Sequence, residues 1–435
     1  MKIIILILLS LPTWAFASFP ELFGSSASTI AVGNQADKET AANNYYASAL
    51  LGFSKKTLFS FNTSYVSTDF KDIDNVVLKN DSNTINNFTR GKSEINNTPT
   101  LMFNAHLSVP LFTPEGPKFN FSVFGPYDRM LEADSGEPYQ PRYVMYDNRF
   151  IRPSVIMSVS QSLGTWAFSL GAQTGFQSNG ETYFVTRTTA GSPSLAKVNF
   201  NAKPSLGLMA SVAKKHNKAT TYLSFQEEMK SKFENRATGQ TEIGGGASFP
   251  FDFQLTSLLY YDPMTVRLGH QREWSDSNLF VSLDYQNWEH YETSHVELKK
   301  KGGTINGSSN FEEIKLKNIF IPKIGFTKKL HDKWAAKIGY FYRASPLKKS
   351  GMTGAGNTLD ADKHVGSLGF AWDFFMLDKL VTLDLGYQGH FLKEFKVTKS
   401  AGREDGNMTQ EKIGSPGYRV GGMIHVLSLG LSWML

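Results

Sequence analysis

The sequence predicts an all-β fold, a transmembrane antiparallel β-barrel, on three observations. First, bulky apolar residues take every second position up to the C-terminus, with small residues between them: Leu427, Leu429, Leu431, Trp433 and Leu435 alternate with Ser428, Gly430 and Ser432. A period of two places these two kinds of side chain on opposite faces of a strand. Second, many similar segments precede this one. Third, the chain opens with an export signal, so we expect lipid against the apolar face.

The export signal comprises residues 1–17. Lys2 precedes an apolar core from Ile3 to Leu11, and Ala15-Phe16-Ala17 has the pattern of a cleavage site. We therefore expect the mature protein to begin at Ser18. No later stretch approaches the roughly 18 uninterrupted apolar residues that a spanning helix needs, which excludes a helical membrane protein. The chain has no cysteine, so disulfides, an N-terminal lipid anchor on cysteine and cysteine-based zinc sites are excluded too.

The segment from Phe19 to Phe53 differs from the rest of the mature chain. It is rich in small residues, glycine and alanine, and it lacks a period of two. In a barrel such a segment is either a periplasmic extension or a plug folded into the lumen, and the plug is the more informative hypothesis. The predicted organisation is therefore a signal peptide at 1–17, an N-terminal hatch or plug at 18–55, and a transmembrane barrel at 56–435.

Fifteen segments have the composition and period of strands. In chain order they are Leu58–Val66, Leu101–Val109, Lys118–Phe124, Pro153–Leu163, Trp166–Gln177, Leu206–Val212, Thr220–Phe233, Phe249–Tyr260, Thr265–Trp274, Leu279–Tyr291, Ile319–Lys328, Trp334–Tyr342, Val365–Phe374, Leu380–Phe391 and Arg419–Leu435. Single-chain bacterial barrels close with an even number of strands, so one of these predictions has to be wrong. We expect the error near Phe249 to Thr265, where two segments can be one strand plus a loop. Three long polar gaps are typical of extracellular loops: Asp69–Thr98, Asp128–Arg149 and Lys299–Asn318.

Three segments show the two faces of a strand clearly. In the first, one face has Leu101, Phe103, Ala105, Leu107 and Val109, and the other has Met102, Asn104, His106 and Ser108. Trp166–Gln177 and Trp334–Tyr342 repeat the pattern, and Lys337 takes an inward position in the latter. A two-sheet sandwich also alternates, but it would not place Trp and Tyr so regularly near strand ends, where aromatic girdles meet the membrane interface.

The chain is mildly basic, with 45 Lys and Arg against 39 Asp and Glu and a formal net charge of +6. Short basic clusters occur at 299–301, 328–329 and 348–349. They could contact anionic lipid head groups or an anionic substrate, or they are simply solvated loop charges. The expected partners are outer-membrane lipid, lipopolysaccharide and a hydrophobic small molecule, with no nucleic acid.

Several short motifs follow one another in a characteristic order. The N-terminal segment contains Phe23-Gly24-Ser25-Ser26, Ala31-Val32-Gly33-Asn34-Gln35-Ala36-Asp37 and Asn44-Tyr45-Tyr46-Ala47-Ser48-Ala49. Later motifs are Asp284–Tyr291, Trp334–Pro346, Asp360–His364 and Leu383–Tyr387. In this order and spacing they resemble the FadL-type family, outer-membrane transporters of long-chain fatty acids and other hydrophobic compounds. Ala47-Ser48 stands where the family usually has Asn-Pro, and Lys363 stands where it has Arg.

The resemblance implies a 14-stranded barrel plugged by an N-terminal hatch, a monomer that works passively and without a cofactor. A ligand would be captured by loop residues and would pass to an interior pocket. It would then leave sideways to lipid through a shift of the hatch and a kink in the third strand. The corresponding kink candidates are Gly125 and Pro126, because proline cannot donate to a sheet ladder and glycine weakens it. An ordinary strand end followed by a turn is the alternative.

The candidate ligand-binding residues are of two kinds. Apolar loop residues could form the capture groove, or they belong to an aromatic girdle or to loop packing: Tyr127, Met130, Leu131, Tyr139, Tyr143 and Met145. A fatty-acid carboxylate inside the barrel would need a cation. Lys317 matches a basic position of the family by its distance before the next strand, and Arg187 is a second candidate. A structural role is the alternative for both, since charges are common in barrel lumens.

Three other classes compete with a transporter. For an enzyme we find no G-x-S-x-G, no H-E-x-x-H and no spaced metal-ligand cluster, so we predict no catalytic residue, no metal site and no cofactor. His106 stands near Ser108, but sequence supplies no third orienting group, and we interpret His106 as a lumen hydrogen-bonding residue. An open diffusion porin would lack the plug, and a surface adhesin or structural barrel would carry its function in the loops.

Overall fold

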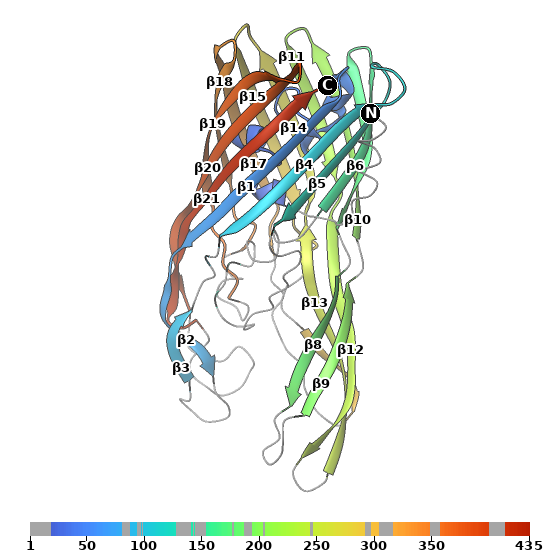
Figure 1. Ribbon diagram of the computed structural model, residues 1–435. Helices are drawn as coiled ribbons and strands as arrows, with labels where there is room; N and C mark the ends of the chain where they lie inside the picture. The colour runs from blue at the N-terminus through green and yellow to red at the C-terminus, as the bar shows by residue number, and fades with distance from the viewer. Residues whose placement is uncertain are drawn as a thin grey trace.

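Fourteen strands form a closed antiparallel barrel, which confirms the predicted fold class (Figure 1). The computed structural model describes residues 19–80, 88–93, 97, 99–127, 141, 143, 154–175, 178–186, 194–202, 205–243, 247–291, 297–303, 316–348, 357–399 and 414–435. The barrel strands are β1 (Leu58–Phe70), β4 (Thr100–Pro110), β5 (Lys118–Pro126), β6 (Ser154–Leu163), β7 (Trp166–Gly175), β10 (Ser205–His216), β11 (Ala219–Gln226), β14 (Met264–Glu273), β15 (Ser277–Asn287), β17 (Ile319–His331), β18 (Trp334–Arg343), β19 (Lys363–Met376), β20 (Lys379–Thr398) and β21 (Gly417–Met434). Each pairs with its neighbours in this order, and β1 closes the barrel against β21.

The two faces of the barrel strands are those that the alternation predicts. On β4 the inward residues Met102, Asn104, His106 and Ser108 are fully buried, and on β18 Lys337 is buried and faces inward. Large apolar side chains stand exposed on the outer face: Leu170, Leu208, Ile338, Leu368 and Leu429 are examples. An apolar exterior around a polar interior is the arrangement that a lipid environment favours.

Seven of the described strands lie beyond the loop end of the barrel, below it in Figure 1. They form two hairpins and one three-stranded sheet: β2 (Ile73–Asn80) with β3 (Phe88–Ser93), β8 (Ser178–Thr186) with β9 (Ser194–Ala202), and β12 (Met229–Ile243) with β13 (Ala247–Asp262) and β16 (Glu297–Gly303). Short turns and the C-terminus lie at the opposite end of the barrel.

Two of the strand predictions need correction. Phe249–Tyr260 lies within β13, which pairs with β12 and β16 and takes no part in the barrel, so the surplus strand is near Phe249, as expected. Thr220–Phe233 is not one strand, because it joins the end of β11 to the beginning of β12. Both errors have the same cause: a sheet outside the membrane has the same period of two as a barrel wall. The other thirteen predicted strands correspond to barrel strands, and the first part of Thr220–Phe233 is the fourteenth, β11.

Residues 19–53 form short helices that lie inside the barrel, where they appear in blue between the strands of Figure 1. They are α2 (Phe19–Phe23), α3 (Ala27–Ala31), α4 (Asn43–Tyr46) and the 3₁₀ helix η1 (Ser48–Phe53). Ser26 caps α3: its hydroxyl accepts a hydrogen bond from Thr29 N at 3.3 Å, and the Thr29 hydroxyl accepts one from Ser26 N at 3.0 Å. None of the helices in these described residues is long and apolar enough to cross a membrane. We call residues 19–53 the hatch.

Candidate functional site

Inward-facing glycines make room for the hatch against the barrel wall. Gly325, Gly339, Gly369 and Gly386 lie on the adjacent strands β17, β18, β19 and β20. A Cβ on Gly386 would lie 2.6 Å from the carbonyl oxygen of Ala27, and one on each of the other three would collide with residues 31–33. Only glycine lets a second backbone approach a strand this closely. These four glycines, which we call the glycine seat, hold α3 and the turn that follows it.

Polar side chains of β1, β4 and β5 form hydrogen bonds with the hatch. The ring of His106 contacts Ser25 O at 2.7 Å through Nε2 and the Ser122 hydroxyl at 2.8 Å through Nδ1. Asn44 Nδ2 donates to the same Ser122 hydroxyl at 2.9 Å, and Ala27 N donates to Asn62 Oδ1 at 3.1 Å. His106 is therefore a lumen hydrogen-bonding residue, as predicted. Because buried polar groups need partners, these contacts fix the position of the hatch as well as its fold.

Two acidic residues of the hatch pair with cations of the barrel. Lys337 Nζ lies 2.8 Å from Asp37 Oδ2 and 3.0 Å from Asp384 Oδ1 on β20, and all three side chains are at most 8% exposed. Arg343 lies 2.7 Å from Glu21 Oε1 in an equally buried pair. Removing one partner of a buried pair leaves an uncompensated charge, at a cost of roughly 3–5 kcal/mol. Loss of one partner of either pair is therefore expected to loosen the hatch.

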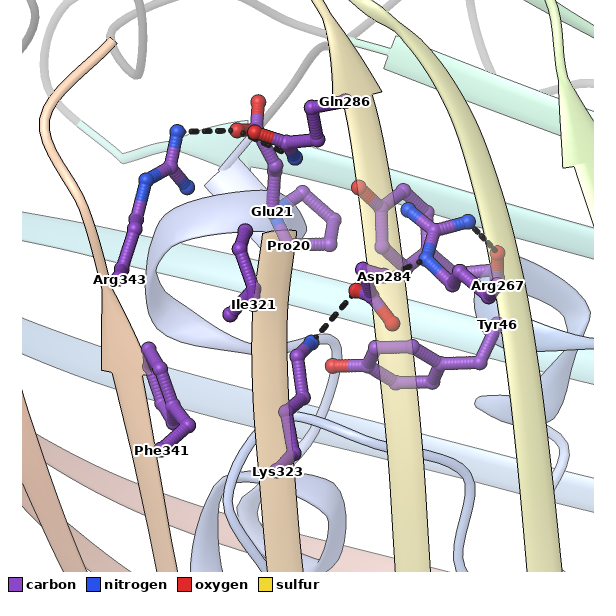
Figure 2. Close-up of a pocket in the computed structure, with 11 residues that line it drawn as sticks. Pro20, Glu21, Tyr46, Arg267, Asp284, Gln286, Ile321, Lys323, Phe341 and Arg343 are labelled. Atoms are coloured by element: carbon purple, nitrogen blue, oxygen red, sulfur yellow. Dashed lines mark hydrogen bonds and ion pairs between the residues drawn. The ribbon is translucent and has the colours of Figure 1, made fainter. Parts of the chain in front are cut away.

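A small charged cavity lies where α2 meets the wall (Figure 2). Lys323 Nζ contacts Asp284 Oδ2 at 2.8 Å and also donates to Asn34 O of the hatch at 2.6 Å. The residues that line this cavity are Pro20, Glu21, Tyr45, Tyr46, Arg267, Asp284, Gln286, Ile321, Lys323, Phe341 and Arg343. Three cations and two carboxylates in this lining leave one positive charge in excess. The cavity is thus suited to an anionic group.

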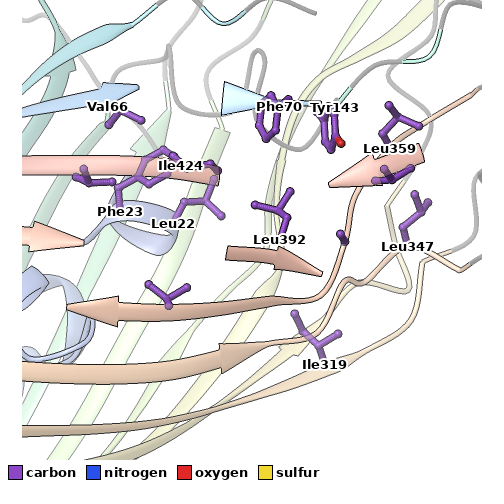
Figure 3. Packing of buried hydrophobic residues seen from close by; sticks show 14 of the residues in the cluster. Leu22, Phe23, Val66, Phe70, Tyr143, Ile319, Leu347, Leu359, Leu392 and Ile424 are labelled. Carbon is purple, nitrogen blue, oxygen red and sulfur yellow. The ribbon is translucent and has the colours of Figure 1, made fainter. Parts of the chain in front are cut away.

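The lumen between this cavity and the loops is apolar (Figure 3). Leu22 and Phe23 of α2 belong to the same buried cluster as inward-facing residues of the surrounding strands and loops: Val66, Met102, Ile319, Ile321, Phe341, Val365, Leu392, Ile424 and Val426 are among them. Nearer the turns, the inward residues are polar instead, as Ser60, Asn62, Asn104 and Ser108 show. The lumen is therefore apolar on the loop side of the hatch and polar around the hatch itself.

Three of the predicted ligand-binding residues lie in the described part of the chain. Tyr127 is half-exposed, and its hydroxyl lies 3.0 Å from that of Thr63 on the outer wall. Tyr143 is buried, stacks on Phe70 with 4.1 Å between ring centroids, and donates to Gly421 O at 3.0 Å. Lys317 is exposed near the loop end. The structure thus does not bring these three side chains together in one site. The remaining candidates, Met130, Leu131, Tyr139, Met145 and Arg187, lie outside the described residues.

The kink candidates end the third barrel strand. Pairing between β5 and β4 continues to Gly125 and Pro126, opposite Phe103 and Met102. On the other side, the described pairing between β5 and β6 ends at Phe124, opposite Ser154. The positions before β6 that this register would place opposite Gly125 and Pro126, 153 and 152, lie outside the described residues.

Sequence reasoning missed the cations and carboxylates that bind the hatch. Glu21, Asp37, Lys323 and Arg343 were not among the candidates, and Lys337 was noted only for its inward position. The available signal was a charged residue at an inward position of a strand whose other face is apolar. This signal does not identify the residue that pairs with each charge, because the two members of a pair are distant in the sequence: Glu21 and Arg343 are 322 residues apart.

Comparison with solved structures shows the same architecture elsewhere. A Pseudomonas aeruginosa FadL homologue covers 97% of this chain and 99% of its own length, with a TM-score of 0.63 and 13% identity. The toluene transporter TodX of Pseudomonas putida covers 95% and 99%, with a TM-score of 0.54 and 14% identity. At these identities the likeness concerns the fold, and at that level it confirms the resemblance that the sequence motifs indicate.

A similar sequence gives a more specific relationship over a shorter stretch. Alkane uptake protein A of Marinobacter nauticus is 31% identical over 149 residues, which is 33% of this chain. The matched stretch spans 32% of the length of that relative. No family model matches the chain.

Proposed function

We propose that this chain is an outer-membrane transport protein of the FadL type, which takes up hydrophobic compounds passively and catalyses no reaction. The observation that carries this proposal is the apolar loop-side lumen that ends on α2 of the hatch. Side chains fill this region in the structure, and a hydrophobic solute that displaced them would gain about 25 cal/mol for each Å² of apolar surface that it buries there. The similarity to an alkane uptake protein and the shared fold with a toluene transporter support the same class of cargo.

The cargo that we propose is a long-chain fatty acid or a hydrocarbon of similar bulk. An alkyl chain would replace side chains of the apolar cluster, and Phe23 and Phe341 lie at its inner end. A fatty-acid carboxylate would then reach the excess positive charge of the cavity, where Lys323 and Arg343 lie. A hydrocarbon needs no such partner. We keep Lys317, Arg187 and the apolar loop residues as candidates for the first capture of the ligand at the surface.

A substitution in the apolar lining tests the proposed passage. Phe341→Asn should weaken binding of n-hexadecane to the purified barrel about tenfold, because about 1.4 kcal/mol of apolar contact is lost. Phe341→Leu keeps an apolar side chain and should change the dissociation constant less than threefold. Equilibrium binding of n-hexadecane, toluene and oleate can be measured on both variants and the wild type. Equal affinity of the Asn variant and the wild type would show that the ligand does not use this passage.

We also propose that the ligand leaves sideways beside β5. Gly125 and Pro126 support an opening there, because they end β5 and because glycine and proline weaken a sheet ladder. The hatch blocks the direct route through the lumen, so a lateral exit would avoid displacing the whole plug.

A disulfide across β5 and β6 tests the lateral exit. Val123 and Val155 are direct strand partners, and the chain has no other cysteine to interfere. Val123→Cys/Val155→Cys should bind n-hexadecane normally but lose at least fivefold in uptake rate when oxidised, and reduction should restore uptake. Single-cysteine variants serve as controls. Unchanged uptake by the oxidised protein, with the disulfide verified by mass spectrometry, would contradict exit at this place.

A further inference from the structure

Three cations on the outer face of the longest strand hairpin are without a partner among the described residues. Lys393 and Lys396 on β20 and Arg419 on β21 are exposed, and no described hydrogen bond or ion pair joins their side chains to other residues. The nearby Lys71 differs, because its Nζ lies 2.5 Å from Glu394 Oε1. This cation cluster, Lys393, Lys396 and Arg419, therefore carries three positive charges that no described ion pair joins to a carboxylate.

The strand register brings two of these charges directly opposite each other. Lys396 pairs with Arg419 across the ladder of β20 and β21, so both side chains leave the same face of the sheet. Like charges in directly opposed positions destabilise a strand pair. No described ion pair joins a carboxylate to this pair: Glu394, two positions before Lys396, pairs with Lys71 instead, whereas Arg236 of the extramembrane sheet has Asp252 at 2.6 Å. An anion from outside the chain would remove the repulsion.

The height of the cation cluster on the barrel indicates which anion is available. The same outer face carries an aromatic belt just nearer the turns: Tyr65, Tyr387, Phe391 and His425. Tyr387 donates through its hydroxyl to His425 Nδ1 at 2.8 Å or accepts from it, depending on the tautomer. Such belts lie at the level of lipid head groups. Lys393 follows Phe391 by two positions and Lys396 by five, or roughly 16 Å along the strand. The cation cluster therefore begins at the head-group level and continues outward, and β20 and β21 can be followed beyond the barrel in Figure 1.

We propose that the cation cluster binds the phosphate groups of lipopolysaccharide, with the acyl chains lying against the aromatic belt below it. The proposal rests on the outer-membrane location in the proposed function and does not depend on the cargo. Phosphate oxygens suit Lys and Arg, which donate charge-assisted hydrogen bonds to them. One bound lipid would contact β20 and β21 beside the seam where β21 pairs with β1, and would neutralise the opposed Lys396 and Arg419.

Binding of bisphosphorylated lipid A to the full barrel in detergent micelles tests the site. Lys396→Gln/Arg419→Gln should weaken binding of fluorescent lipid A about tenfold. Lys299→Gln/Lys301→Gln is the matched control, because it removes the same charge from exposed positions of β16, and it should change the affinity less than twofold. The wild type should bind lipid A without phosphates, phosphatidylglycerol and inorganic phosphate at least tenfold more weakly than bisphosphorylated lipid A.

Several outcomes would overturn the site. The first is that the Lys396/Arg419 variant binds bisphosphorylated lipid A as tightly as the wild type does. The second is that the Lys299/Lys301 control loses as much affinity as that variant. The third is that the wild type binds phosphate-free lipid A, phosphatidylglycerol or inorganic phosphate as tightly as bisphosphorylated lipid A. Binding of n-hexadecane is measured on the same samples and should be unchanged in both variants. A wild type that binds lipid A at the cation cluster but no hydrophobic cargo would refute the proposed cargo and leave this site standing.

Discussion

Lys337→Met is expected to lower the free energy of unfolding by roughly 3–5 kcal/mol and to release the hatch from the wall. The substitution removes the cation between Asp37 and Asp384, and both carboxylates are buried. Two like charges would then face each other without compensation, and the one that can move is Asp37, because it belongs to the hatch. Thermal unfolding in detergent and single-channel conductance in a planar bilayer measure the two consequences. We expect a lower unfolding temperature and frequent open events.

Two further variants separate the ion pair from a general loss of stability. Lys329→Met removes a lysine on β17 that is 51% exposed and pairs with the exposed Asp332, so it should cost less than about 1 kcal/mol and leave the channel closed. Lys337→Met with Asp37→Asn and Asp384→Asn removes all three charges and should recover much of the lost stability. A closed, fully stable Lys337→Met barrel would contradict the anchoring role.

Gly369→Leu is expected to prevent α3 from reaching its place on the wall. Gly369 faces inward on β19, and a side chain there would collide with Ala31 of the hatch. The Cβ of Ala31 is fixed to the backbone of α3, so it cannot swing aside as the end of a flexible side chain can. The hatch therefore has to move away. We expect protease to cleave residues 19–53 at least tenfold faster than in the wild type, and ion conductance to rise.

The same strand offers a matched control. Gly366 is also on β19, but a Cβ there would meet nothing within 4 Å. Gly366→Leu should therefore leave both the protease resistance of residues 19–53 and the closed state of the channel unchanged. If Gly366→Leu and Gly369→Leu behave alike, the effect comes from leucine on this strand and not from the loss of the seat.

The barrel could be predicted from the sequence because the alternation of side chains within each strand indicates the surroundings of its two faces. In Leu101–Val109 the alternation alone identified the inward His106 and the outward Leu101, and the structure confirms both. The period of two does not state which sheet a strand joins, and for that reason Phe249–Tyr260 was assigned to the wrong one. Whether a strand lies within the membrane or outside it depends on the whole fold, so ten residues of sequence do not contain that information.

The candidate site was predicted less well, for a different physical reason. Hatch contacts join residues that are far apart in the chain: Asp37 and Lys337 are separated by 300 positions. Their pairing depends on the register of several strands and on where the glycine seat places α3. Lys337 could be recognised as inward, but no local pattern shows that its partner is Asp37. Lys317, chosen from a family position, lies exposed near the loop end instead of in the charged cavity.

One measurement tests the central claim most directly: uptake of labelled n-hexadecane, toluene, oleate and a small sugar by cells that produce this chain and lack any transporter of their own for these compounds. The account predicts faster uptake of at least one of the three hydrophobic compounds, no change for the sugar, and no steady ion conductance of the purified barrel in a planar bilayer. Faster uptake of the sugar alone, together with steady conductance, would contradict it and would identify an open diffusion porin.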